Sequence, residues 1–373
     1  MSQRHNIAII AGQLVVGGAE RQLYLWLSHL DRERFQPVVI TLHPGYDDYW
    51  EKVIESLDIP LLRIPHRHNS LVRLFEITQA LHSYKPQLIH GWHLFTSPYA
   101  GAAAKLLRAQ VSLGSLRSSY DSYTRQKTLS RLTERLVDGI LVNSHVTEEQ
   151  LAKAKRWPKK KIYVVQNAVE DQFEERSRAR SRLCERWNIP EARTWIGTMG
   201  RFEASKRFDL MLDLAKYLNG CGENFHLILI GYGNGVGGLR ERATTLQIDD
   251  RVTFIGPDPD ARQWLCALDI FCFPSDDEGL PNAVMEAAAA GVPVIAWRMP
   301  FMEELLENDQ SAMFVEPGVF SEFCIKLLTL IRDPVLRSRL GQAGQTLILN
   351  RFSVNKLIQR LSSVYDELLG NRV

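Results

Sequence analysis

Short apolar runs rich in β-branched residues alternate with longer amphipathic stretches along most of the chain. In the first half, seven such runs predict β-strands, and helical patterns lie between most of them. The predicted strands are Asn6–Ile10, Pro37–Thr41, Leu61–Ile64, Leu88–Gly91, Ser112–Leu116, Gly139–Val142 and Ile162–Val165. Parallel neighbours need a connection of about a dozen residues or more, which a helix supplies. The pattern therefore predicts a Rossmann-like domain over residues 1–168.

A densely charged stretch, EDQFEERSRARSRLCERWNIP, follows this series and ends in proline. It is poor in β-branched residues and typical of a surface crossover, so we expect a linker over residues 169–190. A second alternating series then predicts another Rossmann-like domain over residues 191–350. Its expected strands are Thr194–Met199, His226–Ile230, Val252–Ile255, Ile270–Phe273 and Pro293–Ala296.

The predicted fold class is therefore α/β, with two Rossmann-like domains facing across a cleft. In such sheets, ligands bind outside the carboxyl ends of the strands. Beyond Ala312 the pattern is largely helical, with helices expected over Phe320–Ile331, Pro334–Asn350 and Val354–Leu369. The last segment, 351–373, is expected to form a helix that packs back on the N-terminal domain.

Composition narrows the function classes. A chain of 373 residues exceeds the roughly 250–300 residues at which one hydrophobic core stops growing, which supports two domains. Its 45 basic and 43 acidic residues nearly cancel, which argues against a protein that mainly wraps nucleic acid. Five cysteines without a C-x-x-C pair indicate neither a zinc site nor a disulfide framework. With no signal peptide and no apolar run of about 18 residues, we expect a cytoplasmic protein.

The segment FCFPSDDEGLPNAVMEAAAAGVPVIAW combines a buried strand, a Gly- and Pro-containing loop and a helix that begins near Pro281. The free amides at such a helix N-terminus make a ready phosphate site. Glu278 stands just before them, and Glu286 lies about 7.5 Å of helical rise beyond Pro281. The two carboxylates can therefore meet different parts of one ligand. The alternative is a dipole-capping Glu278 and a solvated Glu286, but alanines surround Glu286, which favours a partnered role.

Two further turns are candidates for binding an anion: one carries two cations and the other carries two glycines. Arg201 and Lys206 follow the first strand of the second domain in TMGRFEASKRFDL, where two cations can hold a diphosphate and stabilise its developing charge. Near the N-terminus, Gly17 and Gly18 lie between a strand and a helix and let backbone approach an anion. Exposed loop charges and ordinary turn glycines are the alternatives. The acidic loop strengthens the functional interpretation.

The pieces GGAE, GRFEASKR and EGLPNAVMEA occur in this order, with VNSHVTEEQL, VVQNAVE, LIGYGNG and RVTFIGPDPDARQWLCALDIFCFPS between them or nearby. Over nearly its whole length the chain thereby resembles the retaining glycosyltransferases of family 4, which have the GT-B fold. The Glu-x7-Glu loop is the most specific of these motifs. The donor-binding residues that the resemblance implies are Gly17, Gly18, Arg201, Lys206, Glu278, Gly279, Leu280 and Glu286.

The resemblance also implies separate roles. Glu278 would contact hydroxyls of the donor sugar and Glu286 the ribose, while Arg201 and Lys206 would hold the diphosphate. The two N-terminal glycines would close over the phosphates from the opposite domain. Retention in this family is explained by a front-face reaction, in which the leaving diphosphate oxygen helps deprotonate the acceptor. No metal or other cofactor is expected beyond the nucleotide sugar as co-substrate.

One position departs from the family. Many relatives carry a histidine after the fifth N-terminal strand, where it contacts the donor sugar, and VSLGSLRSSYDS places Arg117 there. Arg117 is a candidate catalytic residue with Arg201, Lys206 and Glu278, and it can hold a sugar hydroxyl, a charged group or an acceptor phosphate. His90 and His93 are further candidates for acceptor or sugar contact. A structural histidine is at least as common at such a place.

Two motifs point elsewhere but weakly. Asp258 and Asp260 form a D-x-D, a spacing that binds metal in another glycosyltransferase fold, but a helix follows them, so capping is expected. The glycines of GYGNGVGG follow a strand, yet RVTFIG does not end in the acid that a nicotinamide ribose needs, which argues against a dehydrogenase.

The sequence therefore predicts a hexosyltransferase-like enzyme that moves a sugar from a UDP- or GDP-sugar to a glycan or lipid-linked acceptor in surface polysaccharide or glycolipid synthesis. A nucleotide-sugar epimerase of the same fold and a non-catalytic nucleotide-sugar-binding subunit are the alternatives. The basic segment Tyr123–Arg135 can contact an anionic membrane at its inner face, although a solvated helix face is the simpler explanation. No nucleic-acid partner is expected.

Overall fold

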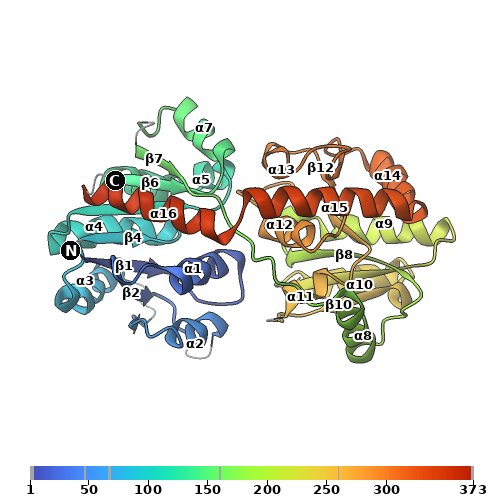
Figure 1. Ribbon diagram of the computed structural model, residues 1–373, viewed down its shortest axis with the longest axis horizontal. Coiled ribbons are helices and arrows are strands. Elements are labelled where there is room, and N and C mark those ends of the chain that lie inside the picture. The colour runs from blue at the N-terminus through green and yellow to red at the C-terminus, as the bar shows by residue number, and fades with distance from the viewer. Residues whose placement is uncertain (1–3, 46–47, 66–68, 159–160, 259, 371–373) are drawn as a thin grey trace. The chain divides into compact units, whose positions relative to one another are not determined.

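The computed structural model describes residues 4–45, 48–65, 69–158, 161–258 and 260–370. The chain folds as two compact units. The first comprises Met1–Ala168 with Val354–Val373, and the second comprises Val169–Ser353. In each unit, helices cover both faces of a parallel sheet (Figure 1).

The sheet of the first unit has the strand order β3-β2-β1-β4-β5-β6-β7, with every pair parallel. Its strands are β1 His5–Ala11, β2 Phe35–Thr41, β3 Leu61–Arg63, β4 Leu88–Gly91, β5 Val111–Leu116, β6 Gly139–Val142 and β7 Ile162–Val164. Its helices are α1 Gly18–His29, α2 Tyr49–Glu55, α3 Ser70–Leu81, α4 Ser97–Leu107, α5 Tyr120–Arg125, α6 Lys127–Leu136, α7 His145–Lys153 and α16 Val354–Leu369. The order reverses between β1 and β4, where such sheets open a ligand site.

Strand β1 shows why these apolar runs form a buried sheet. Ile7 and Ile9 pack in the core on one face, whereas Ala8 and Ile10 pack in the core on the other. Successive side chains of a strand point to opposite faces, so a strand covered by helices on both sides must be apolar throughout. The continuous run IAIIA is the result.

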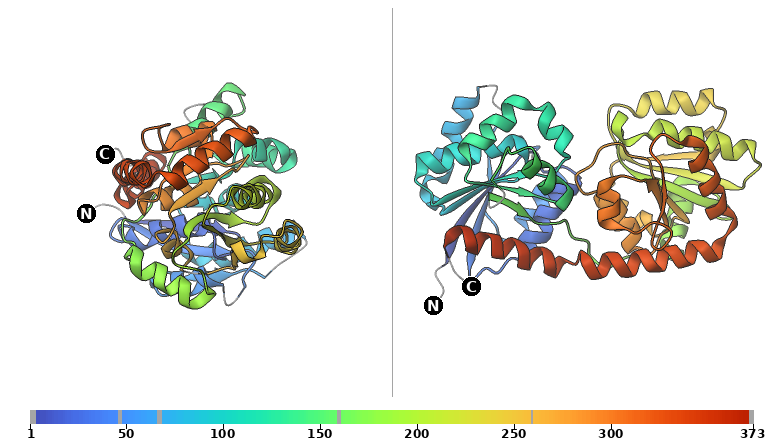
Figure 2. Two further views of the ribbon diagram at one scale, coloured as in Figure 1. Left: turned by 90° about the vertical axis from the view of Figure 1, so that its right-hand side faces the viewer. Right: turned by 90° about the horizontal axis from the view of Figure 1, so that it is seen from above.

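Helix α16 completes the first unit although it lies at the end of the chain. Its residues Leu357, Leu361 and Val364 are buried in the same core as β1, and α16 packs beside α1 (Figure 2). The Tyr365 ring meets the Trp26 ring edge-on, with centroids 5.4 Å apart. Apolar burial therefore ties the C-terminal segment to the first unit, as the sequence predicts.

The second unit contains a six-stranded parallel sheet in the order β10-β9-β8-β11-β12-β13. Its strands are β8 Thr194–Arg201, β9 Phe225–Tyr232, β10 Val252–Ile255, β11 Ile270–Phe273, β12 Val294–Trp297 and β13 Met313–Val315. Its helices are α8 Arg176–Trp187, α9 Phe208–Gly220, α10 Val236–Thr245, α11 Ala261–Leu265, α12 Asn282–Ala289, α13 Pro300–Leu305, α14 Phe320–Arg332 and α15 Pro334–Arg351. Its order reverses between β8 and β11, again at a topological switch point.

The predicted strands are all present, most with ends shifted by one or two residues. Strand β13 was not predicted, because the chain after Ala312 has a largely helical pattern. Three buried residues form this edge strand beside β12, and such a short run has no readable period. Residues 169–190, expected as a linker, belong to the second unit and contain α8, whose Ala179 and Leu183 enter that unit's core.

Helix α15 supports α12 through a very close approach. A Cβ on Gly341 would lie 2.1 Å from the Gly291 carbonyl oxygen, and Gln345 Nε2 donates to the Ala289 carbonyl at 2.9 Å. The Ala289 and Gly291 carbonyls both lie at the C-terminal end of α12. The position of α12 therefore depends on residue 341 of α15 being glycine, which has no Cβ.

We predict that Gly341→Ala lowers the free energy of unfolding of the second unit by about 2–4 kcal/mol, because the backbone of Gly291 must shift to admit the methyl group. Gly238→Ala is the matched control: this residue lies inside α10, and an added Cβ would meet nothing within 4 Å. There, alanine should stabilise the helix by about 0.5–1 kcal/mol. Denaturant unfolding of both variants tests this, and equal effects would contradict it.

Candidate active site

Arg201 is the last residue of β8, and glycines of β9 set its position. The two strands pair through Gly200 with Gly231 and through Arg201 with Tyr232. A Cβ on Gly231, whose φ is +150°, would lie 1.8 Å from the Gly200 carbonyl oxygen. Only glycine allows this approach. The LIGYGNG motif thus fixes the strand end that presents Arg201.

Lys206 and Glu278 meet at the carboxyl edge of this sheet. The Lys206 ammonium contacts Oε1 of Glu278, and the Ser275 hydroxyl donates to the same oxygen at 3.1 Å. The Ser205 carbonyl accepts from the Asp276 amide at 2.8 Å. The loops after β8 and β11 are therefore joined, and the side chains of Lys206 and Glu278 are only 17% and 14% exposed. The sequence predicted both residues, and the structure brings them together.

Arg201 and Arg207 differ in their freedom to bind a ligand. The Arg201 side chain is 61% exposed and pairs with Glu203 at 3.0 Å, an exposed contact of a kind that contributes about 0–1 kcal/mol and exchanges easily. Arg207 instead bridges Asp209 at 3.2 Å and Asp276 at 3.5 Å, and these carboxylates raise its pKa, Asp209 most. Arg201 is thus the more available cation.

Glu286 lies on α12 and is buried with 7% exposure. Helix α12 begins at Asn282 after Pro281 and Gly279, and no side chain caps its N-terminus. Leu280 places its side chain in the unit's core, so only its backbone is available to a ligand. A helix N-terminus attracts anions through its dipole and free amides.

The D-x-D carboxylates serve packing in this unit. Asp258 pairs with Arg186 at 2.9 Å and Asp260 pairs with Arg182 at 2.8 Å, both arginines on α8. Asp258 Oδ1 accepts from the Asp260 amide at 2.8 Å, whereas Asp260, at the start of α11, makes no side-chain cap. The two acids therefore hold α8 against the start of α11.

In the first unit, Gly17 precedes α1 in an extended conformation. A Cβ there would lie 2.3 Å from Oε2 of Glu20, so the Glu20 carboxylate folds over the helix N-terminus. Oε1 of Glu20 lies 3.1 Å from Nε2 of His93. A side-chain carboxylate thus occupies the place where Gly17 and Gly18 were predicted to approach a phosphate.

His90 is buried and has both ring nitrogens occupied. Nδ1 lies 2.7 Å from the Tyr365 hydroxyl on α16, and Nε2 lies 2.6 Å from the Ser115 hydroxyl on β5. Burial, followed by the charge of Arg117, holds the pKa of His90 well below its ordinary value of 6.5. In this conformation His90 offers no ring nitrogen to a ligand, and its contacts join α16 to the sheet.

Arg117 directly follows β5, and its guanidinium lies 3.7 Å from the centre of the Trp92 ring. Trp92 is itself fixed by a 2.8 Å hydrogen bond from Nε1 to the Ala19 carbonyl. Nε and Nη2 of Arg117 have no solvent contact and no hydrogen-bond partner in the described part of the chain. Burial lowers the pKa of Arg117 from 12.5 to about 9, so it remains charged at neutral pH.

Stacking does not compensate for this burial. A cation over an aromatic ring gains about 0.5–2 kcal/mol, whereas an unpaired buried charge costs several kcal/mol. Arg117 as a whole is half-buried, so the uncompensated burial concerns its shielded Nε and Nη2 donors. Arg117 is also the residue of the first unit that departs from the family pattern, in which a histidine usually stands at this position.

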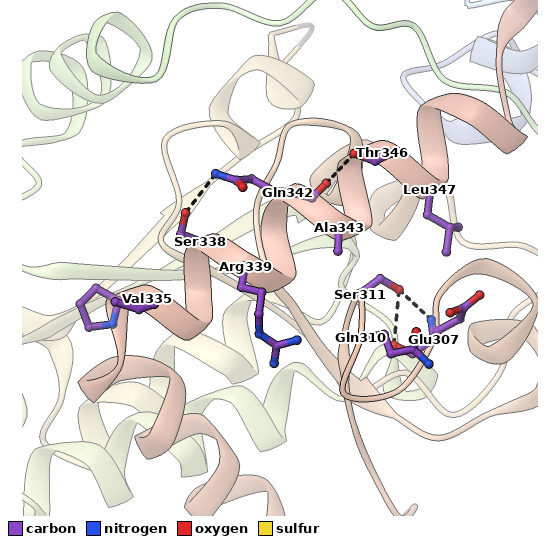
Figure 3. Close-up of a pocket in the computed structure, with 11 residues that line it drawn as sticks. Glu307, Gln310, Ser311, Val335, Ser338, Arg339, Gln342, Ala343, Thr346 and Leu347 are labelled. Atoms are coloured by element: carbon purple, nitrogen blue, oxygen red, sulfur yellow. Dashed lines mark hydrogen bonds between the residues drawn. The ribbon is translucent and has the colours of Figure 1, made fainter.

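A hollow of about 910 Å³ lies elsewhere in the second unit, between α15 and residues 307–311. Figure 3 shows Ser311 beside Glu307 and facing α15, where Gln342 Nε2 donates to the Ser338 hydroxyl at 3.2 Å. Its described lining contains none of the predicted site residues. We therefore place the candidate active site at the carboxyl ends of β8 and β11, where Lys206 and Glu278 meet, and not in this hollow.

Three residues that position the candidates were not predicted from the sequence: Glu20, Trp92 and Ser275. Glu20 was visible in the GGAE motif as an acid in the first turn of a helix. Trp92 sits between the two predicted histidines. Which residues each of these side chains contacts depends on tertiary packing, and the hydrophobic periodicity of the sequence does not encode those contacts.

The buried neutral His90 predicts a pH-dependent stability. Between its depressed folded-state pKa and 6.5, the unfolded chain binds a proton that the folded first unit does not. Stability therefore rises with pH, and on acidification below 6.5 it falls by up to about 1.4 kcal/mol per pH unit.

Hydrogen exchange of the β4 and β5 amides at pH 7.5 and 5.5 measures this change in the first unit. His90→Gln should be less stable than the wild type at pH 7.5, yet should lose less stability on acidification. An identical pH dependence in both proteins would contradict the assignment.

The two parallel sheets, with cations and carboxylates at the carboxyl ends of β8 and β11, fit the class of glycosyltransferases with the GT-B fold. Two family models match the chain, Glycosyltransferase Family 4 over residues 16–173 and Glycosyl transferases group 1 over residues 180–347. The chain belongs to this family of glycosyltransferases, as its motifs predict, and is an enzyme of the transferase class.

Relatives agree with this assignment. The lipopolysaccharide core biosynthesis glycosyltransferase LpsD of Rhizobium meliloti is 27% identical over 366 residues, 95% of this chain and 97% of that protein. LpsE of the same organism is 28% identical over 177 residues, which is 48% of this chain and 50% of that protein. The structure of HepE from Anabaena with UDP-glucose superimposes with a TM-score of 0.86 at 20% identity, covering 98% of this chain and all of the other. This last likeness confirms the fold.

Proposed function

We propose that this enzyme is a retaining glycosyltransferase that moves a sugar from a UDP- or GDP-sugar to a glycan or lipid-linked acceptor in surface polysaccharide or glycolipid synthesis. The observation that carries the proposal is the contact between Lys206 and Glu278 at the topological switch point of the second unit. The names of LpsD and LpsE, and the UDP-glucose bound to HepE, support the substrate classes.

Lys206 suits a diphosphate because an ammonium has three donors. One donor meets Glu278, and the others can meet phosphate oxygens. Arg201 can exchange its exposed partner Glu203 for a second phosphate contact. As the bond between the sugar and the diphosphate breaks, these two cations stabilise the charge that collects on the leaving group. Charge stabilisation of this kind is the main catalytic contribution that we assign to the protein.

The two carboxylates suit hydroxyl groups. The described partners of Glu278 all meet Oε1, so Oε2 can accept from a hydroxyl of the transferred sugar. Glu286 would accept from the ribose. Because Glu278 is engaged by Lys206 and Ser275, it is a poor candidate for a nucleophile. We therefore propose a front-face reaction: the acceptor oxygen bonds to the anomeric carbon as the diphosphate departs, and a diphosphate oxygen takes the acceptor proton.

We predict that Lys206→Ala lowers the turnover of the best nucleotide sugar by a hundredfold or more, about 2.7–4 kcal/mol, because charge on the leaving group loses its partner. Glu286→Gln should mainly weaken donor binding, by about tenfold or ~1.4 kcal/mol. Steady-state assays over a panel of UDP- and GDP-sugars measure both effects.

The matched controls are Lys216→Ala on α9 and Glu241→Gln on α10, both exposed, which should retain wild-type kinetics. Full activity of the Lys206→Ala, Glu286→Gln double variant would exclude the proposed site. Reversible conversion of the donor without acceptor would instead indicate an epimerase, and donor binding without turnover a non-catalytic subunit. Since we assign charge stabilisation to Arg201 and Lys206, activity should survive EDTA.

We further propose that the enzyme is cytoplasmic and touches an anionic membrane through α6 and the end of α4. This surface comprises Lys105, Leu106, Lys127, Arg131, Leu132 and Arg135. Leu106 and Leu132 are 63% and 43% exposed. The acid of α6, Glu134, is engaged by Tyr123 at 2.6 Å and Arg156 at 2.5 Å, so the exposed charges of this helix are basic. Exposed leucines among basic residues favour an anionic lipid surface.

Among the helices of the described ranges, none combines the length and apolar character needed to span a bilayer.

Reversing two of these charges, Arg131→Glu with Arg135→Glu, should weaken binding to vesicles of phosphatidylcholine with 30% phosphatidylglycerol at least tenfold, since each basic residue contributes about 1 kcal/mol near such a surface. Sedimentation with the vesicles measures the bound fraction, with pure phosphatidylcholine as the neutral surface. Lys216→Glu with Arg240→Glu, at two exposed residues of the second unit, changes the net charge by the same amount and is the control. Equal binding by the variant and the wild type would refute the membrane surface.

A further inference from the structure

The carboxyl edge of the first sheet carries an unusual cation. Arg117 presents Nε and Nη2 without a hydrogen-bond partner and without solvent contact. Within the described ranges, no acid lies close enough to form an ion pair with it. A guanidinium in such surroundings is normally matched by an anion. The charge of Glu20 raises the pKa of Arg117, but the Nε and Nη2 edge of the guanidinium remains without a hydrogen-bond partner in the described part of the chain.

The two open donors belong to the same edge of the guanidinium. Nε–H and one N–H of Nη2 point in parallel, at a spacing that matches two oxygens of a carboxylate or a phosphate. A single hydroxyl oxygen can satisfy only one of them well. The chemistry of this edge thus favours an oxyanion over a neutral sugar hydroxyl.

Unpartnered acceptors lie on the neighbouring strand ends. His93 follows β4 and Asn143 follows β6, the strands on either side of β5. Nε2 of His93 faces the Glu20 carboxylate, and Nδ1 has no partner; in the neutral tautomer that donates from Nε2 to this carboxylate, Nδ1 is an acceptor. Asn143 donates to the Arg117 carbonyl at 3.3 Å, and its Oδ1 has no partner. Such acceptors suit the hydroxyls that accompany an acidic group on a sugar.

We propose that Arg117 binds an oxyanion, the carboxylate or phosphate of an acidic sugar, and thereby makes this glycosyltransferase selective for a charged substrate. This inference rests on the proposed function. The anion belongs either to the transferred sugar or to the acceptor. Because both donors are shielded, the guanidinium turns away from Trp92, or the side chains over it move, when the ligand binds.

Calorimetry on the full chain separates the two sources. In the donor arm, UDP-glucuronate is compared with UDP-glucose. In the acceptor arm, the protein is saturated with UDP and titrated with glucose 6-phosphate, methyl glucuronide or methyl glucoside. We expect the anionic ligand to bind at least tenfold more tightly than its neutral counterpart in one arm, and that arm identifies the source.

Arg117→Gln should abolish this preference for the anionic ligand, and Arg117→Lys should retain part of it, since a single charge remains. Arg4→Gln, an exposed arginine of the same unit, should keep the full preference. Circular dichroism confirms that each variant is folded, and the Lys variant provides the test if the Gln variant is not.

The proposal is overturned if neither arm shows a preference for the anion, or if Arg117→Gln keeps it. Its failure is distinguishable from failure of the proposed function. If UDP binds and Lys206→Ala abolishes that binding, but no anionic preference exists, only the role of Arg117 is lost. If neither UDP nor GDP binds, the proposed function fails, and this inference fails with it.

Discussion

Parallel strand pairing is the constraint on which both units depend. When all strands of a sheet run in one direction, their carboxyl ends share one edge, and the loops that follow them must meet there. The order reverses beside β8 and β11 in the second unit. Loops that are about 70 residues apart in sequence thereby place Lys206 against Glu278. No local signal in either loop specifies this contact.

Close backbone packing keeps that edge in place. Gly231 lets β9 approach Gly200, and Gly341 lets α15 press against the end of α12. Neither glycine carries chemistry. Each removes a side chain at a point where the main chains of two elements nearly touch, so the cation after β8 and the carboxylates around α12 rest on rigid supports.

The charged groups of the two units are balanced in different ways. In the second unit, Lys206 and Glu278 neutralise each other, and each keeps hydrogen-bonding capacity for a ligand because the described partners of Glu278 meet only Oε1. In the first unit, Glu20 covers its own helix N-terminus and His93 contacts it. Arg117 stacks on Trp92, and within the described residues no carboxylate pairs with its Nε and Nη2. A substrate that brings an anion would relieve this imbalance, whereas a neutral one would leave it.

The sequence by itself determined the two α/β sheets, most strand positions, the return of the last helix and the candidate residues, because apolar periodicity and short glycine- and charge-bearing motifs are local properties. It missed β13, whose three residues carry no period, and it left His90 open between ligand contact and structure. Only the tertiary structure decided that both ring nitrogens of His90 form hydrogen bonds, with Tyr365 and Ser115. It also decided that the Arg117 guanidinium stacks on the Trp92 ring without an ion-pair partner among the described residues. Those contacts join segments up to 275 residues apart, and a linear pattern cannot encode which distant side chains will fill a buried space.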